Sequence, residues 1–247
     1  MFFTYETDLP EGSGYNLFDH KHILLIGLCF LFILICVLIY KKSSPELRTI
    51  LKKSLGTVPF VLILSRMAYV LFCNESIIYE MPLHLCSMAG IICLVHSLTK
   101  GFLSQVLFSL CMPGAILAII FPDGTMYPLL HFITIESYLF HSLIIAYVCF
   151  ILIEDKTVPS IKESYKSVLF LIFTVPFVYL YNLHFHTNFM FLMGPSFGSP
   201  LKGIYDSYGY PGYLVVFGIL ALAEIFIINL LFQMLISRSL HRPKQPL

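Results

Sequence analysis

The sequence predicts an all-α integral membrane protein, a polytopic bundle in which about seven helices cross the bilayer. Of its 247 residues, 58% are hydrophobic and only 12% are charged, whereas a water-soluble domain carries charge on about a quarter of its residues. The apolar residues gather in runs of about 20, the length that a helix needs to cross the hydrocarbon core. We therefore expect one multi-pass domain over residues 1–247, surrounded by membrane lipids and located in the cell membrane.

Seven apolar segments are predicted to span the membrane. They cover residues 22–40, 56–73, 82–98, 102–121, 131–153, 167–183 and 211–236. Pro113 and Gly114 are expected to kink the fourth segment or make it partly re-entrant, and Pro176 interrupts the sixth. Membrane helices tolerate proline because neighbouring helices satisfy the freed carbonyl groups. The first segment has no basic region before it, as a signal peptide would, and is predicted to be retained.

The charged residues between these segments predict the orientation of the chain. One side of a seven-span arrangement carries Lys41, Lys42, Arg48, Lys52, Lys53, Lys100, Lys156, Lys162, Lys166, Arg238, Arg242 and Lys244. The opposite side carries only Lys21 and Lys202 among its lysine and arginine residues, together with several acidic residues. Because cytoplasmic loops are enriched in lysine and arginine, the N-terminus is predicted outside and the C-terminus inside.

Several classes of function are disfavoured by the composition. The formal net charge is +1 and no basic stripe stands out, which argues against nucleic acid as a partner. The seven cysteines form no CxxC pair, and no HExxH motif occurs, so the sequence predicts no metal site and no cofactor. The alternative, a metal held by histidines and Glu136, would need a convergence that the spacing does not enforce.

Ionisable and amide side chains lie within or beside the apolar segments, where each needs a partner or a function. They are concentrated in the outer half or at mid-depth: Arg66, His84, Cys86, His131, Glu136, His141, Asn182 and Glu224. One shared polar cavity would account for this clustering. The 184–210 connection is long enough to act as a lid over that cavity, and the competing interpretation is a loose outer loop.

Helical periodicity divides these residues further. At about 100° per residue, His131, Tyr138 and His141 fall on one stripe of the fifth segment, together with Thr134. Glu136 lies off this stripe by roughly 140° from His141, and we expect it to pair with Arg66. Glu224 is the competing partner for that guanidinium. An arginine–glutamate pair in a membrane bundle often serves only to hold helices together, and a lone histidine often does the same.

Cys86 is the candidate nucleophile. It falls in the first turn of its helix, where unpaired amides and the positive end of the dipole stabilise a thiolate and an oxyanion. His84 stands about 200° away if both residues are helical, so a base is expected from another segment, either His141 or His131. Burial among apolar groups would have the opposite effect and leave the thiol inert.

Four runs of sequence resemble a known family. PLHLCS at 82–87, TIESYLFH at 134–141, TNFMFL at 187–192 and GYPGYLVV at 209–216 resemble the YwaF-like bacterial integral membrane proteins. That family is similar to the eukaryotic transmembrane protein 164 family, and the resemblance extends from about residue 20 to 236. It implies lipid acyl transfer with Cys86 as nucleophile, His141 as base and His84 as a supporting group. Tryptophans that the family often carries near 209–212 are absent here.

The sequence therefore leads to one predicted function and two alternatives. The prediction is a membrane-embedded acyltransferase or ester hydrolase, in which Cys86 attacks a lipid ester and His141 transfers the proton. Arg66 would neutralise a headgroup phosphate, and His131, Glu136, Tyr138, Asn182 and Glu224 would line the cavity. The first alternative is binding or transport of a small solute or lipid, with Arg66, Glu136 and Glu224 as coupling charges. The second is a structural or sensory membrane subunit.

Overall fold

The computed structural model describes residues 1–99, 102–154, 159–195 and 199–240, with side chains as far as residue 234. All regular structure within these ranges is helical. The principal helices are α1 (His20–Lys42), α2 (Pro45–Phe72), α3 (Leu85–Thr99), α4 (Leu103–Val106), α5 (Met112–Ile120), α6 (Phe132–Glu154), α7 (Tyr165–Phe185) and α8 (Lys202–Leu240). Short helical turns are η1 (Glu6–Asp8), η2 (Ile77–Glu80), η3 (Leu107–Cys111), η4 (Ile161–Glu163) and η5 (Phe189–Phe191).

Six of the seven predicted spans are long and apolar enough to cross a membrane. They are His20–Lys42, Pro45–Phe72, Leu103–Ile120, Phe132–Glu154, Ile161–Phe185 and Lys202–Met234. The exception is α3, which has 15 residues and is about 22 Å long, several ångströms short of the hydrocarbon thickness. The helix predicted from residue 82 begins at Leu85, after η2 and Pro82, and its crossing of the membrane stays a prediction.

Proline and glycine shape two of these helices in different ways. The segment from α4 to α5 is continuous, and Pro113 follows directly after the π-helical turn η3, so the chain does not re-enter at this point. A π turn inserts one extra residue into a helix and often absorbs a local mismatch. In α8 the break falls at Gly209 and Tyr210, which have non-helical backbone angles just before Pro211. The predicted start of the last span at 211 matches the second part of α8.

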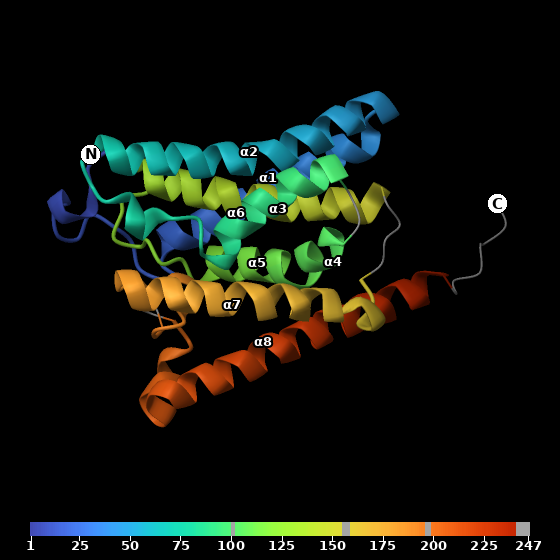
Figure 1. The fold of residues 1–247 in the computed structure, drawn as a ribbon. Helices are drawn as coiled ribbons and strands as arrows, with labels where there is room; N and C mark the ends of the chain where they lie inside the picture. Colours follow the sequence, from blue (N-terminus) through green and yellow to red (C-terminus); the bar gives the residue numbers. More distant parts are fainter. Residues whose placement is uncertain (100–101, 155–158, 196–198, 241–247) are drawn as a thin grey trace.

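The helices run roughly side by side, except for α8, which lies obliquely to the others (Figure 1). The N-terminus, η2 and the connection between α7 and α8 lie at one end, called the N-terminal end below, and α8 finishes at the other (Figure 1). The start of the chain and the end of α8 therefore lie at opposite ends of the bundle (Figure 1). Which side faces the cytoplasm stays a prediction. Among the cations that predict it, Lys100, Lys156, Arg242 and Lys244 lie outside the described residues, as does the side chain of Arg238.

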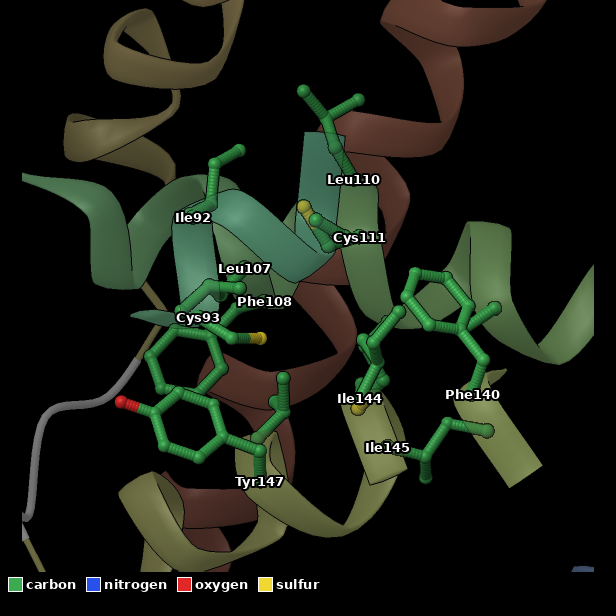
Figure 2. Close-up of a cluster of buried hydrophobic side chains, with 14 of the residues drawn as sticks. Ile92, Cys93, Leu107, Phe108, Leu110, Cys111, Phe140, Ile144, Ile145 and Tyr147 are labelled. Atoms are coloured by element: carbon green, nitrogen blue, oxygen red, sulfur yellow. The ribbon is translucent and has the colours of Figure 1, made fainter. Parts of the chain in front are cut away.

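The apolar core forms where α6, α3 and the π turn meet (Figure 2). Phe108 of η3, Cys93 of α3 and Tyr147 of α6 are each fully buried there. Gly90 of α3 permits the close approach of this helix, because a Cβ atom at that position would stand 3.0 Å from the ring of Phe140 on α6. By contrast, only 11% of the residues in the apolar stretches of α1, α7 and α8 are buried within the described structure, as expected for surfaces that contact lipid.

Buried polar side chains join the helices at the end opposite the N-terminus. His96 of α3 bonds through one ring nitrogen to Ser104 Oγ and through the other to Tyr147 Oη, both at 2.8 Å. Asn229 of α8 accepts a hydrogen bond from Gln105 Nε2 at 2.6 Å. Such interhelical hydrogen bonds stabilise membrane bundles, where no water competes for the same groups.

Candidate functional site

Cys86 lies in the first turn of α3, at the N-terminal end of the bundle, as the sequence predicted. Its side chain is half-buried and faces α5: a Cβ atom added at Gly114 would stand 4.0 Å from the Cys86 sulfur. Gly114 therefore leaves room beside the thiol that any larger residue would occupy.

His141 of α6 is held in one orientation by its own helix. The Nδ1 proton is donated to the carbonyl oxygen of Ser137 over 2.6 Å, one turn earlier. This bond fixes the neutral tautomer in which Nε2 carries a lone pair, which is the form that accepts a proton from a nucleophile. The ring also meets the edge of the Phe140 ring, at 5.3 Å between centroids.

The placement of Cys86 and His141 follows from the contact between α3 and α6. Gly90 lies one helical turn after Cys86 on the same face of α3, and it packs against Phe140, the residue before His141. Gly90 and Phe140 thus mark a contact between the two helices that carry Cys86 and His141. Cys86 and His141 make no hydrogen bond with each other in the described structure. For comparison, the Cys29 thiol donates a hydrogen bond to the Tyr138 carbonyl over 3.8 Å. Catalytic hydrogen bonds in unliganded enzymes are often long and shorten only when substrate binds.

His84 has a different environment from the one its motif suggests. Its Nδ1 accepts a hydrogen bond from the backbone amide of Met190 over 3.3 Å, and its ring lies 5.1 Å from Phe189 and 5.3 Å from Phe191. Burial, and to a lesser extent the charge of Arg66, lowers the pKa of His84 to about 4. The side chain is therefore neutral at pH 7 and contacts the connection after α7.

Arg66 of α2 pairs with Glu136 of α6, as predicted, and also with Glu80 of η2. The Nε atom is 2.8 Å from Glu80 Oε2, and Nη1 is 3.4 Å from Glu136 Oε2. Sequence reasoning treated Glu80 only as a loop charge, although its position just before the α3 start places it at the same end of the bundle. With two carboxylates beside one guanidinium, the cluster is acidic and does not present a free cation to a phosphate.

His131 and Tyr138 bind the N-terminal segment. The Nε2 atom of His131 lies 2.9 Å from the carbonyl oxygen of Thr4, and the Tyr138 hydroxyl lies 3.1 Å from that of Tyr15. Tyr69 of α2 also donates to the Thr4 carbonyl over 3.1 Å. Residues 2–15 thus cover the C-terminal end of α2 and the start of α6, an interaction that no sequence pattern had indicated.

The remaining predicted residues, Asn182 and Glu224, do not share a site. Asn182 is buried at the end of α7, where it bonds to both backbone groups of Phe189, each over 2.9 Å. Glu224 lies on α8, and its Oε1 atom is buried without a hydrogen-bond partner among the described residues. Most of the predicted site residues thus have hydrogen-bond partners on different segments of the described structure, and their sharing of one cavity stays a prediction.

A cavity of about 490 Å³ opens at the N-terminal end of the bundle. It is lined by Tyr79, His84, Asp123, His186, Thr187, Asn188, Phe189, Phe191 and Met193. Of the residues predicted to form a site, only His84 contributes to it. Among the described residues, no group of three or more histidine, cysteine, aspartate or glutamate side chains is arranged to hold a metal ion.

Comparison with known proteins supports the membrane assignment. The model of the TMEM164 family matches residues 17–229, which is most of the chain and includes every predicted site residue. Neither the search of curated proteins nor the search of solved structures produced a match. The six long apolar helices make this a multi-pass membrane protein. Because the family model matches most of its length, the chain belongs to the TMEM164 family.

Proposed function

We propose that the protein transfers or hydrolyses the acyl group of a membrane lipid, with Cys86 as nucleophile and His141 as base. The observation that carries this proposal is the half-buried thiol in the first turn of α3, one helical turn before Gly90, which contacts Phe140 of α6. The α3 amide groups not used within the helix can stabilise the oxyanion that forms on the ester carbonyl. The membrane would be the cell membrane, and the substrate would reach the site from the lipid phase.

The reaction consists of two proton-balanced steps. First, the Cys86 thiol gives its proton to His141 Nε2 as the sulfur attacks the ester carbonyl, and His141 then protonates the departing alcohol oxygen. The carbon–sulfur bond forms and the ester carbon–oxygen bond breaks, which leaves a thioester on Cys86. In the second step, His141 removes a proton from an acceptor alcohol or from water, and that oxygen attacks the thioester. The carbon–sulfur bond breaks, and His141 returns the proton to the Cys86 sulfur.

The test is covalent labelling of the full-length protein in lipid nanodiscs. A lipid-like electrophilic probe should label the wild type on Cys86, and Cys86→Ala should abolish that label. Cys36→Ala is the matched control, because Cys36 is a partly exposed thiol on the lipid-facing helix α1. His141→Asn should slow labelling by about 100-fold or more, the usual contribution of a general base.

Two results would refute the assignment. One is labelling that persists in Cys86→Ala and disappears when another cysteine is replaced. The other is an unchanged labelling rate in His141→Asn. If the assignment holds, a comparison of lipids in cells that carry wild-type protein or Cys86→Ala will identify the acyl donor and acceptor, because only those species should change in abundance.

A second function, solute binding or transport, is favoured by one group of observations. The Arg66 cluster and the unpartnered Glu224 oxygen place ionisable groups inside the bundle that the acyl-transfer mechanism does not use. Buried charges of this kind often couple ion movement to transport. Solute uptake into vesicles that is lost in Arg66→Ala and Glu224→Ala, but kept in Cys86→Ala, would favour transport over acyl transfer.

A further inference from the structure

The connection after α7 is an ordered cover over the start of α3. Residues 186–194, called the cover segment here, contribute Phe189 and Leu192 to a buried cluster that includes Leu83. Met190 of this segment and Met88 of α3 pack against that cluster. The loose outer loop considered from the sequence is therefore replaced by a segment with defined contacts. These contacts lie on both sides of Cys86 in the sequence, at residues 83–88.

Hydrogen bonds from two asparagines give the cover segment its shape. Asn182 at the end of α7 bonds to both backbone groups of Phe189 and accepts from the Thr187 hydroxyl over 2.8 Å. Asn188 donates to the Gly194 carbonyl and accepts from the Met193 amide. The segment is thus folded on itself and tied to α7.

The backbone of the cover segment is strained where it meets α3. Met190 and Phe191 have φ angles of 56° and 55°, in the left-handed region that bulky residues avoid. Such conformations persist only where surrounding contacts hold them, and they are frequent in clamps and switches. The contact that holds Met190 is the hydrogen bond from its amide to His84 Nδ1.

We propose that His84 is a proton-sensitive latch that holds the cover segment over the start of α3 and releases it when the imidazole becomes charged. A neutral His84 accepts the Met190 amide at Nδ1, whereas an imidazolium carries protons on both nitrogens and can accept nothing. Protonation therefore removes this hydrogen bond and places the new Nδ1 proton of His84 against the Met190 amide proton, so that two donors face each other. This inference concerns access to the α3 start and does not depend on the proposed acyl chemistry.

Other groups around His84 set the direction of the response. The charged and titratable side chains that face it are Arg66 of α2, Tyr79 and Glu80 of η2, Asp123 before α6, and His186 of the cover segment. Burial and Arg66 favour the neutral ring, whereas Glu80 favours the charged one. With the folded pKa at about 4 and an ordinary value of about 6.5 in the open state, the closed form is fully stabilised above pH 6.5. That stabilisation is lost as the pH falls toward 4.

Hydrogen–deuterium exchange of the full-length protein in nanodiscs tests the latch directly. After correction for intrinsic exchange rates, protection of peptides covering 187–193 should fall about 30-fold between pH 7.5 and pH 5. Peptides from α6 should keep their protection, which serves as the internal control for folding. His84→Asn should stay closed at both pH values, because its amide oxygen accepts the Met190 amide and does not titrate in this range.

Two further variants make the test specific. His84→Leu removes the acceptor and should leave the cover segment poorly protected even at pH 7.5. His186→Asn removes the other imidazole of the cavity, and asparagine tolerates the left-handed conformation (φ 54°) at this helix end, so the pH response should remain. Equal protection at both pH values in the wild type, or a response lost in His186→Asn and kept in His84→Asn, would overturn the proposal.

Discussion

Asn229 links α8 to the rest of the bundle, and its removal should weaken the whole structure. Its Oδ1 accepts from Gln105 Nε2 over 2.6 Å, and its Nδ2 donates to Ser164 Oγ over 2.9 Å at the start of α7. Asn229→Leu deletes both interhelical bonds and leaves two buried polar partners unsatisfied. At about 0.6–2 kcal/mol for each interhelical bond, the free energy of unfolding should fall by about 1–4 kcal/mol.

A double-mutant cycle isolates the bond to Gln105 from other effects of the substitution. Unfolding of Asn229→Leu, Gln105→Leu and the double variant should be measured in the same nanodisc lipid, and the coupling energy should be about 0.6–2 kcal/mol. Asn188→Ala, at the opposite end of the bundle, is the control, and its effect should add to that of Gln105→Leu within about 0.5 kcal/mol. A coupling energy near zero for the first pair would refute the role assigned to this hydrogen bond.

Three more predictions concern packing, charge and the N-terminal segment. Gly56→Ala should lower Tm by about 2–8 °C because its Cβ would stand 2.6 Å from that of Ser97, whereas Gly27→Ala, with no atom within 4 Å, should leave Tm unchanged or raise it. Arg66→Leu should destabilise the protein by roughly 1–3 kcal/mol by unfolding assay, and the further change Glu136→Leu should restore much of that loss, since no buried carboxylate is then left unpaired. His131→Leu should increase hydrogen exchange of residues 2–6 while α6 stays protected, because it removes the side chain that bonds to their backbone; unchanged exchange there would count against that anchor.

The sequence predicted the helices well because their signal is local. A run of about 20 apolar residues is sufficient to identify a membrane helix, and the six long spans agree with those runs. The errors lie where tertiary contacts decide. Pro113 reads as an interruption, yet the π turn before it keeps the helix continuous. The helix predicted from residue 82 begins at Leu85, because the residues before it form the turn that brings Glu80 to Arg66.

The polar residues were only partly predictable. The argument against a dyad between His84 and Cys86 assumed that both residues are helical, whereas α3 begins after His84. The pairing of Arg66 with Glu136 was one of two options that the sequence left open. Glu80, the Thr4 carbonyl and the Met190 amide were missed as partners. Two of these are backbone groups of irregular segments, which carry no sequence signal of their own, and the third is a side chain in a short turn.

By itself, the sequence determined that this chain is a helical membrane protein, that its ionisable groups gather toward one end, and that Cys86 begins a helix. Those conclusions depend on hydrophobic periodicity and on helix-end geometry, which are properties of neighbouring residues. Only the tertiary structure decided that His84 holds the cover segment, that His131 holds the N-terminus, and that Arg66 serves two carboxylates. Each buried polar group must find a partner wherever the packed bundle offers one, and that choice is made by residues distant in the chain.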